Sequence, residues 1–594
     1  MSRPATIDAR NLTITLLVGG TLLAADPGGW FAFAPIKWAV VTTLSLAVVA
    51  LTTWQRKWVR PDPRIVALLG VFVGWMGLCS LLGADPRYAW IGTPERHAGW
   101  LLWALCAALF LCALPLQPII DGVVLAGVGL VPVLLFDAAG HPLVASGTQR
   151  LTGTFGSAAY LAAACTLIAP VAFGVAVDGG LARWRRRAGW VAAASGVFGI
   201  AGSGTRGAWV AAMAVGIVWG WRNRRSPHLP RMLAYTVAAV LLAALMTPVA
   251  QRAGNVTDNQ AGGGVTRLDE WRVATVVIGE HPVFGSGPEG YRVTFREGVD
   301  AEYERAFGRD PQPDRAHNGF LDAAATGGLP AAAFYAGLIG VVAITIRRRQ
   351  AAWRATSIGA AIALVAYLGQ QQFLFPLAEV EPVVWMLAGA LAAPKRARGT
   401  NGQLPAPGRP VRTRAATAVV AAGALASAWW GTHDVLADRS AAIAVAAADP
   451  SAAVVAARDA VALRGDQVRL WLLLARVSPD PVEQRAAFDR AAEWSPDDPI
   501  LLASRAEFLT TADPPAAVDE LTDLVRLDPF NAQLHNMLGT ALARTDRLEA
   551  AEREWLLALD LAPDSPGPRR NLITLYRQQG RAAEANALEQ SGNQ

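Results

Sequence analysis

The feature that most constrains this chain is a succession of long apolar runs in its first 430 residues. A helix rises by about 1.5 Å per residue, so roughly 20 apolar residues are needed to cross the hydrocarbon of a bilayer. Inside lipid the backbone must satisfy its own hydrogen bonds, and a helix does so within one segment. The first 430 residues are therefore predicted to form an all-α bundle of transmembrane helices.

We predict about thirteen spans, and a fold with twelve is the nearest alternative. They lie near residues 12–25, 31–53, 65–83, 98–115, 119–137, 158–177, 189–204, 206–221, 232–250, 320–346, 355–375, 378–393 and 415–430. The runs at 119–137 and 189–221 show the weakest pattern. The first run is interpreted as a retained helix and not as a cleaved signal peptide, because another apolar run follows almost at once.

Arginine-rich links indicate how the bundle is oriented. Clusters such as 183–187 and 347–349 directly adjoin apolar runs, and basic links alternate with links that are poorer in Arg and Lys. This alternation is typical of membrane topology, so the net charge of +6 is not read as a nucleic-acid surface. The alternation of links predicts a multi-pass protein of the cytoplasmic (inner) membrane, whose helices contact membrane lipids. The N-terminus would be cytoplasmic, and the long link 251–319 would lie outside.

Residues 431–594 are charged and water-compatible, unlike the rest of a chain in which only 17% of residues are charged. Pro496, Pro529 and Pro563 are spaced by 33 and 34 residues, the period of tetratricopeptide (TPR) repeats. Gly539 and Trp555 fall where such repeats place a small and a large residue. We therefore expect a second domain, 431–594, that forms a TPR-like α-solenoid. An odd number of spans would place it outside the cytoplasm. It could hold a protein partner, or it could serve as a stalk without a ligand.

Familiar cofactor and nucleotide motifs are missing from the sequence. It contains no phosphate-binding loop with Lys, no dinucleotide fingerprint, no H-E-x-x-H zinc motif and no nucleophile elbow. The four cysteines lie within apolar runs and form no metal-binding or redox pattern: Cys79, Cys106, Cys112 and Cys165. No metal and no cofactor are expected.

Four residues at the predicted outer face could carry chemistry. Arg206 stands between two apolar runs, where a guanidinium could bind a phosphate or could simply reach the lipid headgroups. Arg267 and Arg272 open a helical stretch of the long link and could be substrate contacts or solvated surface charges. His317 lies where this link enters the next span, and a histidine there could act as a general base near neutral pH. Together they suit an anionic lipid donor.

Several stretches, taken in order, resemble the O-antigen ligase/polymerase superfamily of membrane glycosyltransferases between about residues 60 and 393. The stretches are Gly83-Ala84-Asp85-Pro86, Gly92 to Gly99, Arg150 to Gly156, Ser203 to Trp209, Arg267 to Trp271, Glu280 to Pro288, and Ala316 to Leu321 with Gly327-Gly328-Leu329. Family members often carry Asn just after the glycine turn. Here Ser157, Ala158 and Ala159 stand in that place, so a donor contact from those amides is not expected.

The resemblance implies transfer of glycan from an undecaprenyl-diphosphate carrier to a glycan, lipid or protein acceptor, without a metal or a nucleotide sugar. It assigns the functional histidine to His317 and the functional arginines to Arg206 and Arg267. Ligase, polymerase and protein O-glycosylation remain open. Two other classes of function also remain open: a glycan or lipid transporter, and a non-catalytic scaffold that assembles an envelope complex through its repeats.

Overall fold

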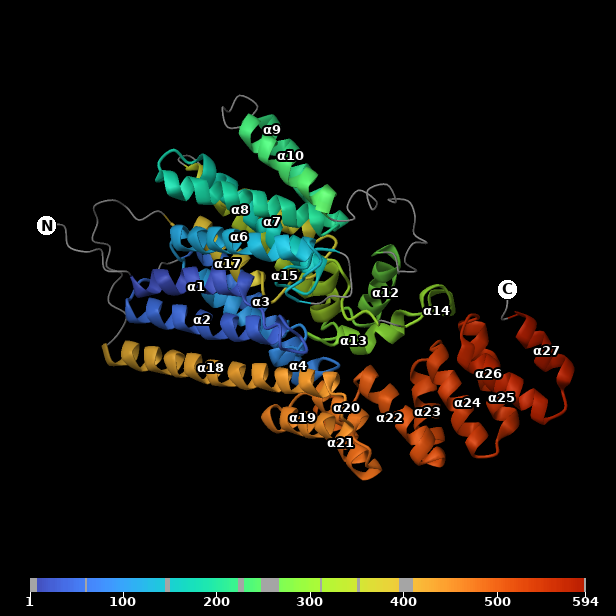
Figure 1. Cartoon of the computed structure of the whole chain (residues 1–594). Coiled ribbons are helices and arrows are strands. Elements are labelled where there is room, and N and C mark those ends of the chain that lie inside the picture. Colours follow the sequence, from blue (N-terminus) through green and yellow to red (C-terminus); the bar gives the residue numbers. More distant parts are fainter. Residues whose placement is uncertain are drawn as a thin grey trace.

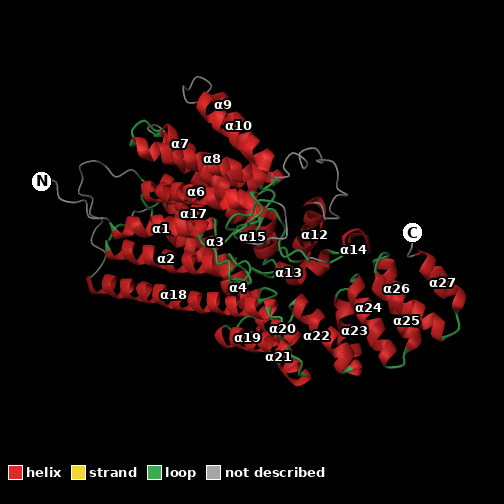
Figure 2. Cartoon of the chain, viewed as in Figure 1, coloured by secondary structure: helices red, strands yellow, loops and turns green. Residues whose placement is uncertain are grey.

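The computed structural model describes residues 8–58, 61–144, 150–222, 229–246, 267–309, 312–349, 353–394 and 410–591. Within these ranges helices are joined by loops and turns and there is no strand, so the predicted all-α class is confirmed (Figure 2). Part of the long link, including the glycine run 262–264, lies outside the described residues.

Each predicted span overlaps one helix of the bundle. In chain order these are α1 (Ala9–Leu23), α2 (Ala34–Trp54), α3 (Pro63–Leu82), α5 (Trp100–Leu111), α6 (Leu116–Ala138), α7 (Ala158–Val177), α8 (Arg183–Gly202), α9 (Arg206–Arg222), α10 (Leu229–Met246), α15 (Gly319–Arg348), α16 (Ala355–Gln370), α17 (Glu381–Ala392) and α18 (Pro410–Ala446). Among the described residues, six of these helices are long and apolar enough to cross a membrane: α2, α3, α6, α7, α15 and α18. Six others are apolar but shorter.

The centre of the bundle is α7, which carries no charged residue and is buried along most of its length. Small residues let its neighbours approach closely. A Cβ atom on Gly174 of α7 would lie 2.7 Å from the carbonyl oxygen of Ala355, and one on Gly359 of α16 would lie 2.5 Å from that of Pro170. Such contacts are the usual way in which membrane helices pack, because lipid supplies no hydrophobic force between them.

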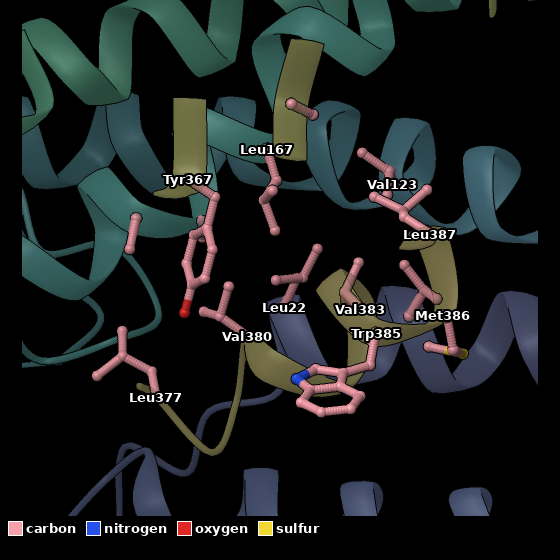
Figure 3. Close-up of a cluster of buried hydrophobic side chains, with 14 of the residues drawn as sticks. Leu22, Val123, Leu167, Tyr367, Leu377, Val380, Val383, Trp385, Met386 and Leu387 are labelled. Atoms are coloured by element: carbon pink, nitrogen blue, oxygen red, sulfur yellow. The ribbon is translucent and has the colours of Figure 1, made fainter. Parts of the chain in front are cut away.

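Next to α7 lies a buried cluster of large apolar side chains (Figure 3). Leu22 of α1, Val123 of α6 and Leu167 of α7 meet Val383, Met386 and Leu387 of α17 there. The polar atoms in this cluster are paired with one another, since Tyr367 and the Trp385 indole donate to the two oxygens of Glu381 at 2.7 and 2.8 Å. The cluster fixes α16 and α17, and therefore the loop 371–380 that joins them.

Short helices cap one end of the bundle: α4 (Pro86–Ile91), α12 (Arg267–Glu280), α13 (Tyr291–Thr294) with the 3₁₀ turn Phe295–Gly298, and α14 (Ala301–Phe307). Of these, α12 packs against α15. That helix has a break where Gly328 has a φ of 71° and Pro330 follows. The turn 282–287 fills this break. Leu329 N–H donates to the carbonyl of Pro282 at 2.9 Å, and Ser286 N–H donates to that of Ala325 at 2.8 Å. Two of the stretches that carry the family resemblance therefore pack against each other.

The C-terminal part is a row of helices, each packed on the next: α19 (Pro450–Leu463), α20 (Val468–Val477), α21 (Pro481–Trp494), α22 (Pro499–Ala512), α23 (Pro514–Leu527), α24 (Ala532–Arg544), α25 (Leu548–Leu561), α26 (Pro566–Gln578) and α27 (Ala582–Ser591). Several begin with an Asp–Pro pair, as at Asp498–Pro499. The Asp498 carboxylate accepts hydrogen bonds from the N–H groups of Ile500 and Leu501. Pro499 occupies the first helical position, where a backbone N–H would have no partner within the helix. That these helices form TPR repeats stays a prediction.

A single helix connects the two parts. The predicted boundary between residues 430 and 431 falls within α18, which packs along α2 and then continues into the C-terminal row (Figure 1). At 37 residues it is about 55 Å long, well beyond the roughly 30 Å of hydrocarbon. The C-terminal row consequently lies at the same end of the bundle as α4, α12, α13 and α14.

Candidate active site around His317

His317 lies in a tight turn immediately before α15, with a φ of 49°. Asn318 fixes the start of this helix, because its side-chain oxygen accepts from the N–H groups of Phe320 and Leu321 at 3.0 and 3.2 Å. The loop after α16 holds the turn from the other side, since Gly319 N–H donates to the carbonyl of Gln371 at 2.7 Å. The turn therefore sets the imidazole at the end of the bundle, where a fifth of its side chain is exposed.

The imidazole contacts a buried carboxylate. Nδ1 of His317 lies 3.3 Å from Oε2 of Glu270 on α12, and the ring packs edge-on against Phe375. Burial alone would raise the pKa of Glu270, but the contacts with His317 and Arg267 outweigh it and hold that pKa below its usual value. Glu270 is thus ionised near neutral pH. A carboxylate facing Nδ1 favours the tautomer with its proton there, which leaves Nε2 able to accept a proton.

A second ion pair lies three residues before His317. The guanidinium of Arg96 binds both oxygens of Asp314, with Nε–Oδ2 at 2.5 Å and Nη2–Oδ1 at 3.2 Å, and it also donates to the Tyr160 hydroxyl. Burial would raise the pKa of Asp314, but the charge of Arg96 and its hydrogen bond keep it at about 2. This fork joins the link 84–97 to the His317 turn, and both belong to stretches that carry the family resemblance.

A third cluster fixes the backbone between Asp314 and His317. Arg315 is almost fully buried, with Nη2 at 2.9 Å from Oε1 of Glu289 and Nη1 at 3.4 Å from Oδ2 of Asp322. Glu289 also accepts from the N–H of Ala98 at 3.0 Å. Burial raises the pKa of Glu289 despite the opposing charge of Arg315. Arg315 therefore connects α15, the 282–290 turn and the 93–98 link directly beside His317.

The four residues predicted from sequence do not all converge. Arg267 lies on α12 one turn before Glu270 and forms an ion pair with it, leaving about two fifths of the Arg267 side chain exposed. Arg272 pairs instead with Asp300 at 3.0 Å, and both side chains are about half exposed. Two residues along a helix from Glu270, Arg272 faces about 200° away, so it is not part of the cluster around His317.

Arg206 is the exposed first residue of α9. The loop after α16 relates it to the site, because a Cβ atom on Gly207 would lie 2.7 Å from Cβ of Phe373. The Phe373 ring is 6.5 Å from that of Trp271 on α12. The start of α9, the middle of α12 and the His317 turn thus surround the same loop.

Arg150 supports the turn before Arg206. Its Nε donates to the carbonyl of Ser203 at 2.6 Å, and its Nη2 donates to the Thr205 hydroxyl at 3.0 Å. Sequence reasoning noted the stretch that Arg150 opens but gave this side chain no role. It also missed Glu270, Arg96 and Asp314. The only available signal for them was their presence within, or beside, the stretches that carry the resemblance.

Comparison with known families covers this same region. Residues 190–336 match the model of the family described as O-Antigen ligase. This segment contains all four predicted residues, together with Glu270 and Asp314. A search of curated proteins finds no match to the chain. The matched segment is similar to O-antigen ligases, and with the six long apolar helices it supports a membrane glycosyltransferase type of function in general.

Proposed function

We propose that this protein transfers glycan from an undecaprenyl-diphosphate-linked donor to an acceptor hydroxyl on the outer face of the cytoplasmic membrane, with His317 as general base. The observation that carries the proposal is the His317–Glu270 contact of 3.3 Å inside the segment that matches O-Antigen ligase. A histidine oriented by a buried carboxylate is suited to accept a proton from a hydroxyl group.

In the proposed reaction the acceptor oxygen attacks the anomeric carbon, and the bond from that carbon to the diphosphate breaks. The hydroxyl proton passes to Nε2 of His317, and the bond electrons leave with the lipid diphosphate. Arg206 and Arg267 are the proposed contacts of this leaving group, since both are exposed residues at helix starts. A guanidinium neutralises developing phosphate charge without a metal. A donor contact by Arg272 stays a prediction.

A purified transfer assay tests the proposal. The full chain is reconstituted in vesicles with undecaprenyl-diphosphate-linked glycan and an acceptor, and acceptor-linked glycan is measured over time. His317→Ala should lower the rate by roughly 10²–10⁴-fold, the usual contribution of a general base.

His281→Ala is the matched control, because His281 forms a similar pair with Glu297 at 2.7 Å but on the surface of the same segment. It should retain transfer. Full transfer by the His317→Ala variant would overturn the mechanism and would favour the scaffold or transporter alternatives.

A further inference from the structure

The C-terminal row of helices contacts the polypeptide that leads into His317. Three arginines of residues 291–309 each bind an acidic residue of this row: Arg292 binds Asp498, Arg309 binds Asp528 and Arg305 binds Asp560. The acidic partners recur at intervals of about one helix pair. The row from α22 to α25, to which they belong, lies at the end of the bundle that carries α13 and α14 (Figure 1). One edge of the row is therefore occupied by another segment of the same chain.

Arg309 makes the most complete of these contacts. Its Nη1 and Nη2 bind the two oxygens of Asp528, each at 2.7 Å, and its Nε binds Glu304 at 2.6 Å. Glu304 in turn accepts from the N–H of Ala532 at the start of α24, at 3.1 Å. The side chains of Arg309, Asp528 and Glu304 are all less than a tenth exposed. A buried, bidentate pair of this kind holds a fixed geometry, which an exposed pair does not.

Arg292 makes a second buried contact, with both parts of the molecule. It binds Asp85, the residue that caps α4, as well as Asp498, the residue that caps α22. Ser495 adds a hydrogen bond to Asp85 at 2.6 Å. The link 84–97, which carries Arg96, is thereby attached to the same edge of the row.

The contacts continue from these arginines to the site. The side-chain amide of Gln312 donates to the backbone carbonyl of Arg292 at 2.8 Å. Two residues later Asp314 binds Arg96, and His317 follows after three more. His317 stands only eight residues after Arg309 in the sequence, and the contacts of Gln312 and Asp314 come directly before it.

We infer that the C-terminal helices position His317, with Arg309 and Asp528 as positioning residues that touch no substrate. This inference rests on the proposed function, because it assigns the docked edge a part in the same reaction. It also assigns that edge of the row to the chain's own segment 291–309 and not to another protein. A displacement of about 1 Å in a reacting group can cost up to about 10²-fold in rate.

The test uses the full chain with Asp528→Asn, which keeps the shape of the side chain but removes its charge. Transfer kinetics are measured with varied donor, and hydrogen exchange is followed in residues 301–309. We expect kcat to fall by about 10-fold or more, with the KM for donor within about twofold, because the base is displaced while the donor contacts remain. Exchange in 301–309 should rise.

Three further variants sharpen the result. Asp528→Glu retains the charge and should recover most of kcat. Arg309→Lys retains the charge but loses the two-pronged contact with Asp528, so its loss of kcat should be smaller than that of Asp528→Asn. Slow hydrogen exchange in α24 and α25 would show that these helices remain folded in the variant. Asp523→Asn is the matched control: Asp523 lies on α23 and pairs only with the exposed Arg526 among the ion pairs of the described residues. It should change neither kcat nor exchange.

Unchanged kcat in an Asp528→Asn chain whose 301–309 segment exchanges faster would overturn the positioning role. Unchanged exchange would overturn the docking itself. Failure of the proposed function would be seen separately, as transfer that survives His317→Ala, while the exchange measurement would still report on the docked edge.

Discussion

At the scale of single residues, the site depends on carboxylates that contact a histidine and an arginine. Glu270 faces Nδ1 of His317 and Asp314 faces Arg96, and neither acid is more than about a third exposed. The role of each can be tested by replacing the carboxylate with its amide, which changes the charge but hardly the volume.

Glu270→Gln should slow transfer by roughly 10-fold or more while the protein stays folded. The amide can still contact Nδ1 but no longer stabilises the positive imidazole that forms when His317 accepts a proton. Steady-state kinetics on the purified variant would show the loss in kcat. A variant with unchanged kcat would mean that Glu270 does not assist the histidine.

Asp314→Asn should lower stability, by about 1–3 kcal/mol, because Arg96 would lose its charged partner. The folded-state pKa of Asp314, about 2, lies below the ordinary value near 4. Its ionised form therefore stabilises the protein above pH about 4, and this contribution is lost as the pH falls towards 2. As the pH falls from about 4 to 2, the midpoint of thermal unfolding should fall less in the variant than in the native chain, because the variant has no carboxylate at this position to protonate. Identical pH profiles would contradict the assigned pairing.

At the scale of elements, periodicity and length predicted the helices well, and the reason is physical. A run of about 20 apolar residues has few alternatives to a helix in lipid, so each of the thirteen predicted spans overlaps one helix, although the helix bounds differ from the predicted ones. The ion pairs were not predictable in this way. Arg96 and Asp314 are 218 residues apart, and Arg309 and Asp528 are 219 apart. Nothing local in the sequence distinguishes these arginines from others in the links.

The break in α15 leads to a prediction for this element. A Cβ atom on Gly328 would lie 2.0 Å from the carbonyl oxygen of Val283, and the φ of 71° disfavours any other residue. Gly328→Ala should therefore destabilise the protein by more than about 1 kcal/mol and displace the 282–287 turn.

Gly337→Ala is the control within the same helix, because nothing lies within 4 Å of a Cβ atom there. It should be neutral or slightly stabilising, since alanine favours a helix over glycine. Thermal midpoints of the two purified variants would check both expectations, and equal midpoints would contradict the role given to the break.

At the scale of the whole molecule, the two parts form a connected unit and not a bundle with a loosely tethered arm. Composition alone divides the chain at about residue 430, yet α18 crosses that boundary without interruption and buried arginines join the parts. Composition could not predict these contacts. It indicates which segments suit water and which suit lipid, but not which surfaces pack together. That the C-terminal helices and His317 face the outside of the membrane stays a prediction from the basic links.

His317 is proposed to promote metal-free transfer of glycan from a lipid diphosphate. The most direct measurement follows both products, acceptor-linked glycan and released undecaprenyl diphosphate, from the purified chain in the presence of a chelator. We predict that the two products appear in equal amounts and that both rates fall together in the His317→Ala variant. Transfer that requires an added metal ion, or equal product formation by the variant, would contradict the proposed role of His317.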